Sequence, residues 1–454
     1  MTHRFVFLRT LFTLTLASAC SPSVGASLVA CTTPAACPYG APVCSEGFCR
    51  PCGEVVGSCG GATPFCRSAG EDAGRCAACR THEDCGAQDG FCWYGACASP
   101  CAKHAECSTS SACVQSDDGE RGGCVPASDV LPVNPSSFLD ALEALRVRAR
   151  ERASALKDGR SALPAPLRVV RLAPSPMPYA PFRLADVRGP VYVVGADAPE
   201  TTVLGGVGFA DAVQVTQGVQ LFLQRVRIEY VRDGIFCEDL RENTEHRARL
   251  ALVEVTILRA REMALSANGC DLWMDRVAMR ESNGGALALD PVARYRITNS
   301  VFADSSSSTG PLLLFDGARG VFRFNTIINN RTTSNVVVGC GQVPSDLGAS
   351  LILRSQDPAR DPAVDPLAGY CQGQDLVLDR ATAASGALVG APALVDSGLF
   401  GDYHPKASPE TSACCVRAVA PLPAGGDYRD PLHDFDGRPR RRSPWTLGAY
   451  EVIP

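Results

Sequence analysis

Lysine is almost absent from this chain of 454 residues. Lys and Arg together number 43, but only three of them are Lys (Lys103, Lys157 and Lys406), and no Lys lies between residues 158 and 405. A lysine base is therefore excluded from most of the chain. A strong excess of one charge is also absent, since the net charge is −5 and Arg is scattered among Asp and Glu. We expect no nucleic-acid partner, because such proteins concentrate basic residues.

The apolar stretch at the N-terminus is too short for a good transmembrane helix. His3 and Arg4 precede it, and small residues at positions 17–19 end it. This pattern predicts a secretory signal peptide over residues 1–19.

Cys20 follows these small residues directly, and two interpretations stay open. The segment fits cleavage by ordinary signal peptidase, and it also resembles a bacterial lipobox, in which Cys20 would carry the lipid and residues 20–30 would form a tether. Removing Cys20 from the 23 cysteines leaves an even number for pairing. Ser21 after it resembles the outer-membrane sorting pattern. We therefore predict an outer-membrane or cell-surface lipoprotein anchored to the membrane by lipid, or a secreted protein if Cys20 is not lipidated.

Sixteen cysteines lie within residues 31–124 and form four groups of four. In each group the first two gaps hold five or six residues and the third holds four to ten. This is an internal repeat of about 24 residues, which is too small to fold around a hydrophobic core alone. The groups are Cys31, Cys37, Cys44 and Cys49; Cys52, Cys59, Cys66 and Cys76; Cys79, Cys85, Cys92 and Cys97; and Cys101, Cys107, Cys113 and Cys124.

Disulfides and zinc are the two ways to hold such a region together. Zinc sites use paired CxxC motifs at fixed spacing, but CxxC occurs here only where two groups meet. Export also implies an oxidising compartment, so we predict two disulfides per group, with three connectivities open for each. The spacing loosely resembles EGF-like or Dickkopf-like modules of bacterial surface proteins, without the six cysteines of EGF. We expect a stiff stalk. Phe91, Trp93 and Tyr94 on it could form a contact, but packing over a disulfide is the preferred interpretation.

Residues 125–137 are rich in Pro and Ser and predict a linker. A helix is expected over residues 138–159, because apolar residues recur with helical spacing. We expect it to cover the open end of the next domain rather than to touch lipid. Its apolar positions are Leu142, Leu145, Ala149, Ala153 and Leu156.

Residues 160–454 change to short β-rich segments that can be aligned with one another. The alignment steps are 29, 22, 23 and 26 residues, and each segment alternates apolar and polar residues as strands do. The aligned positions are Val226, Val255, Val277, Ser300 and Thr326. Two positions later stand Ile228, Ile257, Met279, Phe302 and Ile328.

The alternation changes phase just before the first of these columns, so a bend is expected there. Asn at such a bend tolerates a left-handed backbone. The expected bend residues are Arg225, Glu254, Arg276, Asn299 and Asn325. A repeat of three strands per coil predicts a parallel β-helix, with coils about 4.8 Å apart, in preference to an antiparallel sandwich.

The opening strands, VYVVGADAPETTVLGG, and the C-terminal segments resemble pectin-lyase-like proteins of bacterial surfaces. The C-terminal segments are GAPALVDSGLFGDYHPKASPE and HDFDGRPRRRSPWTLGAYE. The resemblance covers roughly residues 138–454 and implies an all-β fold, a right-handed parallel β-helix. It says almost nothing about activity.

Other candidate features lie within this domain. Cys237 and Cys270 fall on adjacent coils and can pair, as can Cys340 and Cys371, while Cys414 and Cys415 are neighbours in sequence. Asp434 and Asp436 lack the further ligands of an EF-hand, so we expect a tight turn in which Arg438 pairs with a carboxylate, and no metal site.

The strongest candidate for ligand binding is the insertion that lengthens one coil to 29 residues. It gathers Glu238, Asp239, Glu242 and His246, which could hold a sugar or a metal, or could form a solvated loop with internal ion pairs.

Two functions remain open. The first is a non-enzymatic surface lipoprotein that needs no cofactor and binds an extracellular glycan or a surface protein. The second is a lyase or hydrolase of acidic polysaccharide, for which calcium would be the cofactor. The lack of Lys and of an adjacent Asp pair favours the first.

Overall fold

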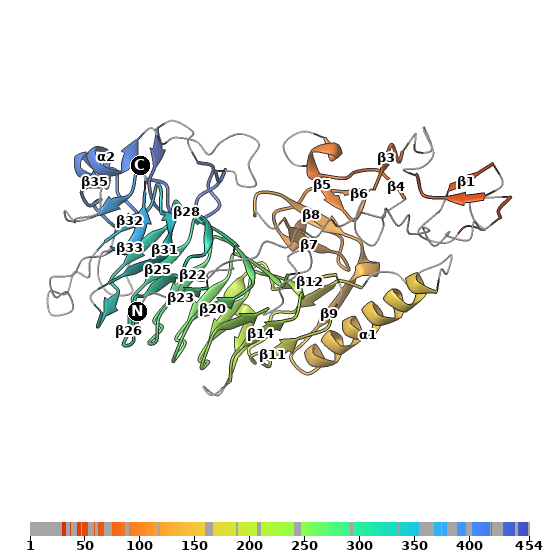
Figure 1. Ribbon diagram of the computed structural model, residues 1–454, viewed down its shortest axis with the longest axis horizontal. Coiled ribbons are helices and arrows are strands. Elements are labelled where there is room, and N and C mark those ends of the chain that lie inside the picture. Colours follow the sequence, from red (N-terminus) through yellow and green to blue (C-terminus); the bar gives the residue numbers. More distant parts are fainter. Residues whose placement is uncertain are drawn as a thin grey trace, which may run out of the picture.

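The computed structural model describes residues 30–452, with gaps at 33–36, 38–42, 47, 53–58, 60–61, 68–74, 87–89, 117–118, 159–166, 188, 207–209, 240–246, 291–293, 335, 354–366, 374, 379–387, 396–401, 418, 420–429 and 441–443. The predicted signal peptide and Cys20 lie outside the described residues. The described chain is a parallel β-solenoid preceded by a disulfide-rich region (Figure 1). This confirms the predicted all-β class.

Four small modules make up the disulfide-rich region, and each ends in an antiparallel hairpin. The strands are β1 (Val43–Ser45), β2 (Phe48–Arg50), β3 (Phe65–Cys66), β4 (Cys76–Ala77), β5 (Phe91–Trp93), β6 (Ala96–Ala98), β7 (Ala112–Gln115) and β8 (Gly122–Val125). Two 3-10 helices, η3 (His82–Cys85) and η4 (His104–Glu106), precede the third and fourth hairpins.

Each module has the same disulfide pattern. The third and fourth cysteines face each other across the hairpin, but they bond to the first and second cysteines respectively. All four modules therefore share one of the three connectivities that the sequence left open. The pairs are Cys31–Cys44, Cys37–Cys49, Cys52–Cys66, Cys59–Cys76, Cys79–Cys92, Cys85–Cys97, Cys101–Cys113 and Cys107–Cys124.

The solenoid has three strands per coil, and equivalent strands of successive coils pair in parallel. The first strands are β9 (Val130–Val133), β10 (Val169–Leu172), β12 (Pro190–Val194), β15 (Gln220–Gln224), β18 (Arg249–Val253), β21 (Asp271–Asp275), β24 (Arg294–Thr298) and β28 (Arg319–Arg323). The second are β13 (Val203–Gly205), β16 (Arg227–Glu229), β19 (Thr256–Leu258), β22 (Ala278–Arg280), β25 (Val301–Ala303), β29 (Thr326–Ile328), β32 (Leu351–Ile352), β34 (Val377–Leu378) and β35 (Leu388–Val389).

The third strands close each coil and meet the first strands through the long β31, which pairs with both runs. They are β11 (Phe182–Leu184), β14 (Val213–Thr216), β17 (Ile235–Glu238), β20 (Leu265–Asn268), β23 (Leu287–Leu289), β27 (Leu313–Phe315), β31 (Val338–Asp346) and β33 (Leu367–Gln372). A short extra pair joins β26 (Ser306–Ser307) and β30 (Arg331–Thr332).

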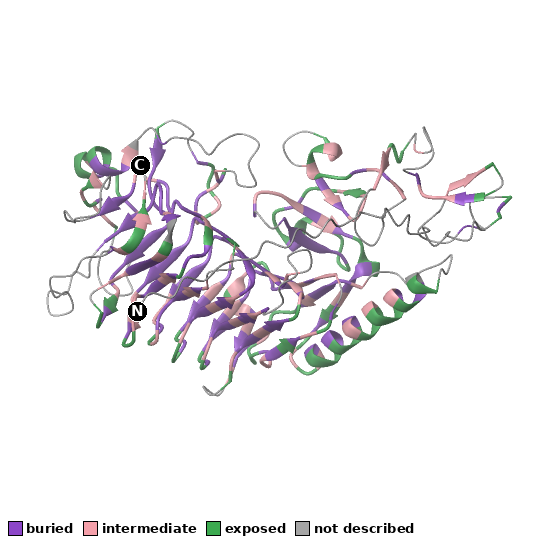
Figure 2. Cartoon of the chain, in the orientation of Figure 1, coloured by how far each residue is buried: buried purple, intermediate pink, exposed green. Residues whose placement is uncertain are grey.

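The core consists of apolar columns that run along the solenoid. Val226, Val255 and Val277 follow one another in adjacent coils, as predicted, and all three are fully buried. Each fully buried aliphatic or aromatic side chain contributes about 1.5–3 kcal/mol of hydrophobic free energy. Figure 2 shows these strands as mostly buried. A second column contains Leu223, Leu252, Met274, Ile297 and Phe322.

The predicted register is wrong by one residue in the last aligned coil. Ser300 stacks on Asn325 and Phe302 on Ile327, whereas the sequence alignment used Thr326 and Ile328. The residue at the bend is therefore Phe324, with φ 57°, and not Asn325. A bulky residue is held in this left-handed conformation because its ring packs against Trp445, with 5.2 Å between the ring centroids.

Two bends per coil have left-handed backbone. The first is at Arg225, Glu254, Arg276, Asn299 and Phe324, and the second is at Tyr230, Arg259, Glu281, Asp304 and Asn329.

At the position after each bend, Asn side chains link neighbouring coils by hydrogen bonds. Asn325 Oδ1 accepts from Ser300 N at 2.8 Å, and its Nδ2 donates to Ile297 O at 2.9 Å. Asn330 makes the matching pair of bonds to Ser305 N and Phe302 O.

The helix α1 (Phe138–Lys157) covers one end of the solenoid, as predicted. Leu142 and Leu145 are buried on its inner side, while its outer side is exposed (Figure 2). Phe138 packs edge-on against Tyr179 and Phe182, with 5.4 and 5.3 Å between ring centroids.

Two expectations about the first third of the chain are wrong. The segment 125–137 is not a free linker, because β9 within it pairs in parallel with β10 and so begins the solenoid sheet. The third and fourth modules are not a free stalk, because they pack on the outer side of the first strands. Side chains that alternate away from the core are apolar there, and the modules bury them.

The C-terminal segment folds back along the solenoid. It contains α2 (Pro409–Cys415), β36 (Val416–Arg417) and β37 (Trp445–Thr446), and Cys414 and Cys415 are bonded to each other. The other two pairs in the domain are Cys237–Cys270 and Cys340–Cys371.

The predicted tight turn follows in this segment. Asp434 Oδ1 accepts from the backbone N–H groups of Asp436 and Arg438, and the Arg438 guanidinium lies 3.3 Å from Asp436.

Candidate functional site

The predicted ligand loop is described only at its start. Asp239 is 3% exposed, and its Oδ2 accepts from Ala248 N at 2.6 Å, which holds the end of the insertion to its beginning. Glu238 is half-buried on β17. Glu242 and His246 lie outside the described residues, so ligand binding at this loop stays a prediction.

The main polar cluster lies instead between the fourth module, residues 101–124, and the solenoid. We call it the docking interface. Its solenoid side chains come from the ends of successive first strands and from the first bend. They contact the module mainly through its backbone. The solenoid residues are Arg171, Gln224, Arg225 and Arg276, and the module residues are His104, Gln115, Gly119 and Glu120.

Arg225 is the most deeply buried of these residues, with 2% exposure. It donates from Nη1 to Ala102 O at 3.1 Å and from Nη2 to Cys113 O. Its charge is offset by Asp197, 3.5 Å away. An Arg at this bend, where Asn suits the backbone better, therefore binds two carbonyls of the module.

Gln224, on the same coil as Arg225, and Arg171, two coils earlier, add further contacts to the module. Gln224 and the backbone of Gln115 bond reciprocally, with Gln115 N donating to Gln224 Oε1 at 3.0 Å and Gln224 Nε2 donating to Gln115 O at 2.7 Å. Arg171 Nη1 donates to Ser111 O at 2.7 Å and to Thr109 O at 3.0 Å. The module backbone is therefore bound at several points along the solenoid.

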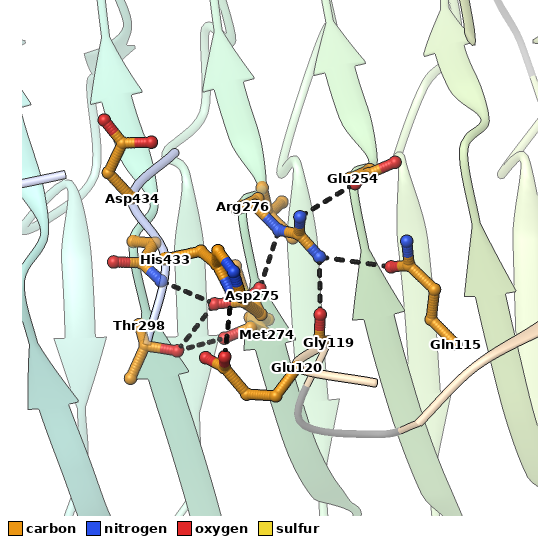
Figure 3. A network of polar contacts seen from close by, with 12 residues as sticks. Gln115, Gly119, Glu120, Glu254, Met274, Asp275, Arg276, Thr298, His433 and Asp434 are labelled. Atoms are coloured by element: carbon orange, nitrogen blue, oxygen red, sulfur yellow. Dashed lines mark hydrogen bonds and ion pairs between the residues drawn. The ribbon is translucent and has the colours of Figure 1, made fainter. Parts of the chain in front are cut away.

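Arg276 continues the interface two coils after Arg225. Figure 3 shows its guanidinium between Glu254, Gln115 and the backbone of Gly119. The distances are 2.9 Å to Glu254 Oε1, 3.1 Å to Gln115 Oε1 and 2.8 Å to Gly119 O. A charged group so well enclosed needs all these partners, because burial without them costs several kcal/mol.

Asp275 lies beneath this loop and is 2% exposed. Its Oδ1 accepts from Thr298 Oγ1 and Asn299 Nδ2, and its Oδ2 accepts from Arg276 Nε at 2.8 Å. Burial raises the pKa of Asp275. A Cβ at Gly119 would lie 2.4 Å from Asp275 Oδ2, so only glycine lets the module loop approach this closely.

The C-terminal segment joins the same region from the other side. His433 Nδ1 lies 3.0 Å from Glu120 Oε2, and this hydrogen bond raises the pKa of His433. The buried Arg440 donates from Nη2 to Asn299 Oδ1 at 2.7 Å. Three segments far apart in sequence therefore meet around Asp275 and Asn299.

His104 stands at the other end of the interface, where η4 meets the solenoid. Its Nε2 lies 2.8 Å from Gly195 O, and its Nδ1 lies 3.0 Å from Cys113 N. Burial, followed by the nearby charge of Arg225, lowers the pKa of His104 to about 4. His104 is therefore neutral at physiological pH.

Aromatic side chains of the third module pack on the solenoid beside the docking interface, rather than only over a disulfide of a stalk. Trp93 packs against Tyr192 with 5.1 Å between ring centroids, and Tyr192 stacks on Phe222 at 4.4 Å. Trp93 Nε1 donates to Asp129 at 2.8 Å, and Arg168 lies 3.7 Å from the ring centroid of Tyr94.

A second cluster fastens the C-terminal segment to the column of second bends. His404 Nε2 lies 2.6 Å from Asp436 Oδ2, and its Nδ1 contacts Asp402. These bonds, that to Asp436 first, raise the pKa of His404. Both ring nitrogens therefore lie against carboxylates, which favour the protonated ring.

Tyr403 beside it is also held in place. Its hydroxyl donates to Asp304 Oδ1 at 2.6 Å and accepts from Asn329 Nδ2 at 3.0 Å. Burial and the bond to Asp304 raise the pKa of Tyr403 to about 12. It therefore stays protonated at neutral pH.

The polar groups of both clusters are used in bonds within the chain. A general base needs an available lone pair within reach of a substrate. Asp275 is covered by the module loop, and His404 uses both nitrogens on carboxylates. These groups bind segments of the same chain to one another.

Sequence reasoning missed the docking interface. The signal that pointed to it was Arg at the two bend positions 225 and 276, where Asn is the residue that suits the backbone. The carbonyl partners of these Arg side chains could not be found, because every residue has a carbonyl.

The chain was also compared with known proteins. No protein-family model matches it, and no curated protein is similar to it in sequence. Within the described part of the chain, no helix combines the length and apolar character needed to cross a membrane.

Proposed function

We propose that this chain is an exported cell-surface lipoprotein with a non-enzymatic binding or structural role. Its solenoid would form the head, and Cys20 would carry the lipid anchor. The observation that carries the non-enzymatic role is the use of Asp275, His404 and Tyr403 in bonds within the chain. A resemblance to right-handed pectin-lyase-like surface proteins is part of this proposal.

Several features support export. Twenty-two cysteines are paired in eleven disulfides, which form and persist in oxidising compartments. Cys20, the remaining one of 23, is the proposed lipidation site. Labelling with a palmitate analogue in a bacterial host tests this. The label should be lost in Cys20→Ala, and retention of the label would contradict lipidation at this residue.

The partner of the head would be an extracellular glycan or a surface protein. A panel of polyuronates with added calcium tests binding and turnover together in the purified protein. Binding without release of unsaturated or reducing ends supports the proposal. Release of such ends at catalytic rates would instead establish the alternative, a lyase or hydrolase of acidic polysaccharide.

A further inference from the structure

His104 can keep its two hydrogen bonds only in the neutral form. Gly195 O needs a donor at Nε2, and the Cys113 N–H needs an acceptor at Nδ1. The neutral imidazole with its proton on Nε2 satisfies both. A second proton on Nδ1 would face the Cys113 N–H, donor against donor.

The surroundings of His104 oppose a positive charge. Arg225 and Arg171 reach the module backbone on either side of it from the solenoid. Asp197 is the acidic group on the solenoid side, and it already accepts from the backbone N–H groups of His104 and Ala105.

Within the module, Glu106 and Lys103 are the charged residues nearest to His104 in sequence. Glu106 accepts from Ala102 N at 2.7 Å. It closes its own turn, and both residues are exposed.

We propose that protonation of His104 releases the fourth module from the solenoid, so that acidification uncovers the face that the module covers. That face is apolar and includes Val169 and Val194, which pack in one cluster with Ala112 and Val114 of the module. The disulfides hold the module together when it leaves, so the release is reversible.

The size and sign of the effect follow from linkage. The pKa of His104 is 6.5 when free and about 4 when docked. The undocked state binds the proton more tightly, so docking is strongest above pH 6.5 and weakens as the pH falls toward 4. At tenfold per unit, docking weakens by about 20-fold between pH 7 and pH 5, and by about 300-fold at the limit.

His433 has the opposite sign. Its bond to Glu120 raises its pKa, so its contribution to docking is complete below pH 6.5 and is lost as the pH rises. It therefore cannot produce release in acid.

Hydrogen exchange at single residues tests the proposal on the full, oxidised chain. The amides of His104, Ala105 and Gln115 donate to Asp197 and Gln224 across the interface. After correction for intrinsic exchange, their protection should fall about 20-fold between pH 7 and pH 5. Amides of the core strand β21 should not change, which separates release from unfolding.

Two variants identify the group responsible. His104→Gln keeps one donor and one acceptor without a titratable ring, so its docking amides should change less than twofold. His433→Gln removes the opposing contribution, so its fall in acid should be at least as large as that of the unmodified chain. Unchanged protection in the unmodified chain, an equal fall in His104→Gln, or no fall in His433→Gln would each overturn the proposal.

Discussion

Arg225→Asn separates the two demands on the first bend. Asn tolerates the left-handed backbone at this position, with φ 52°, better than Arg does, but its shorter side chain cannot reach the module. The change removes two charge-assisted bonds, to Ala102 O and Cys113 O, and leaves the buried Cys113 carbonyl without this donor. Such bonds contribute about 1.5–3 kcal/mol each, so docking should lose about 3–6 kcal/mol. The backbone gain of about 1 kcal/mol stabilises the solenoid in the docked and the undocked state alike, so it does not offset this loss.

The docking amides of His104 and Gln115 report this loss at pH 7. Their protection factors should fall by about 100-fold or more, since 1.4 kcal/mol corresponds to a factor of ten. Protection in the strands of the solenoid core should be retained, because the core columns are untouched.

Arg259→Asn is the matched control, since it makes the same substitution at a second bend with φ 57°. Arg259 is 42% exposed and pairs with Glu281 and with the buried Glu229, which also contacts Arg227, so none of its partners belongs to the docking interface. Its docking amides should keep their protection. The reasoning is refuted if Arg225→Asn keeps docking protection within threefold, or if Arg259→Asn loses as much.

Two further predictions concern the fourth module and the C-terminal segment. Gly119→Ala places a Cβ 2.4 Å from Asp275 Oδ2 at a residue with φ 70°, so it should lower the protection of the docking amides by tenfold or more. The control is Gly310→Ala, whose Cβ would have no atom within 4 Å and which should leave this protection unchanged. Equal effects in the two variants would contradict the close-approach argument. The pKa of His404 is raised, so its contribution to stability is complete below pH 6.5 and is lost as the pH rises through that pKa. The melting temperature of the unmodified chain should therefore fall between pH 6 and pH 9, and that of His404→Gln should change less. Parallel curves would show that the pair with Asp436 contributes nothing.

The solenoid could be predicted because its period is visible in the spacing of apolar side chains. Positions that face the core recur once per coil, and Val226, Val255 and Val277 stack as their spacing indicated. The register failed in the last coil, where Phe324 occupies a bend that Asn325 was expected to occupy. Packing on Trp445, which lies more than a hundred residues away, outweighed the backbone preference.

The cysteine groups show a similar division. Their spacing and even number predicted disulfides, but several pairings satisfy the same spacing. The hairpin in each module sets the third and fourth cysteines opposite each other and turns their sulfurs toward the first and second.

The sequence by itself determined the repeat, the buried columns, the capping helix and the cross-linked modules, because each depends on local periodicity or on residue type. The tertiary structure alone decided that the modules lie against the solenoid. That contact joins Arg225 and Arg276 to backbone carbonyls, and a carbonyl has the same chemistry at every position until folding places it.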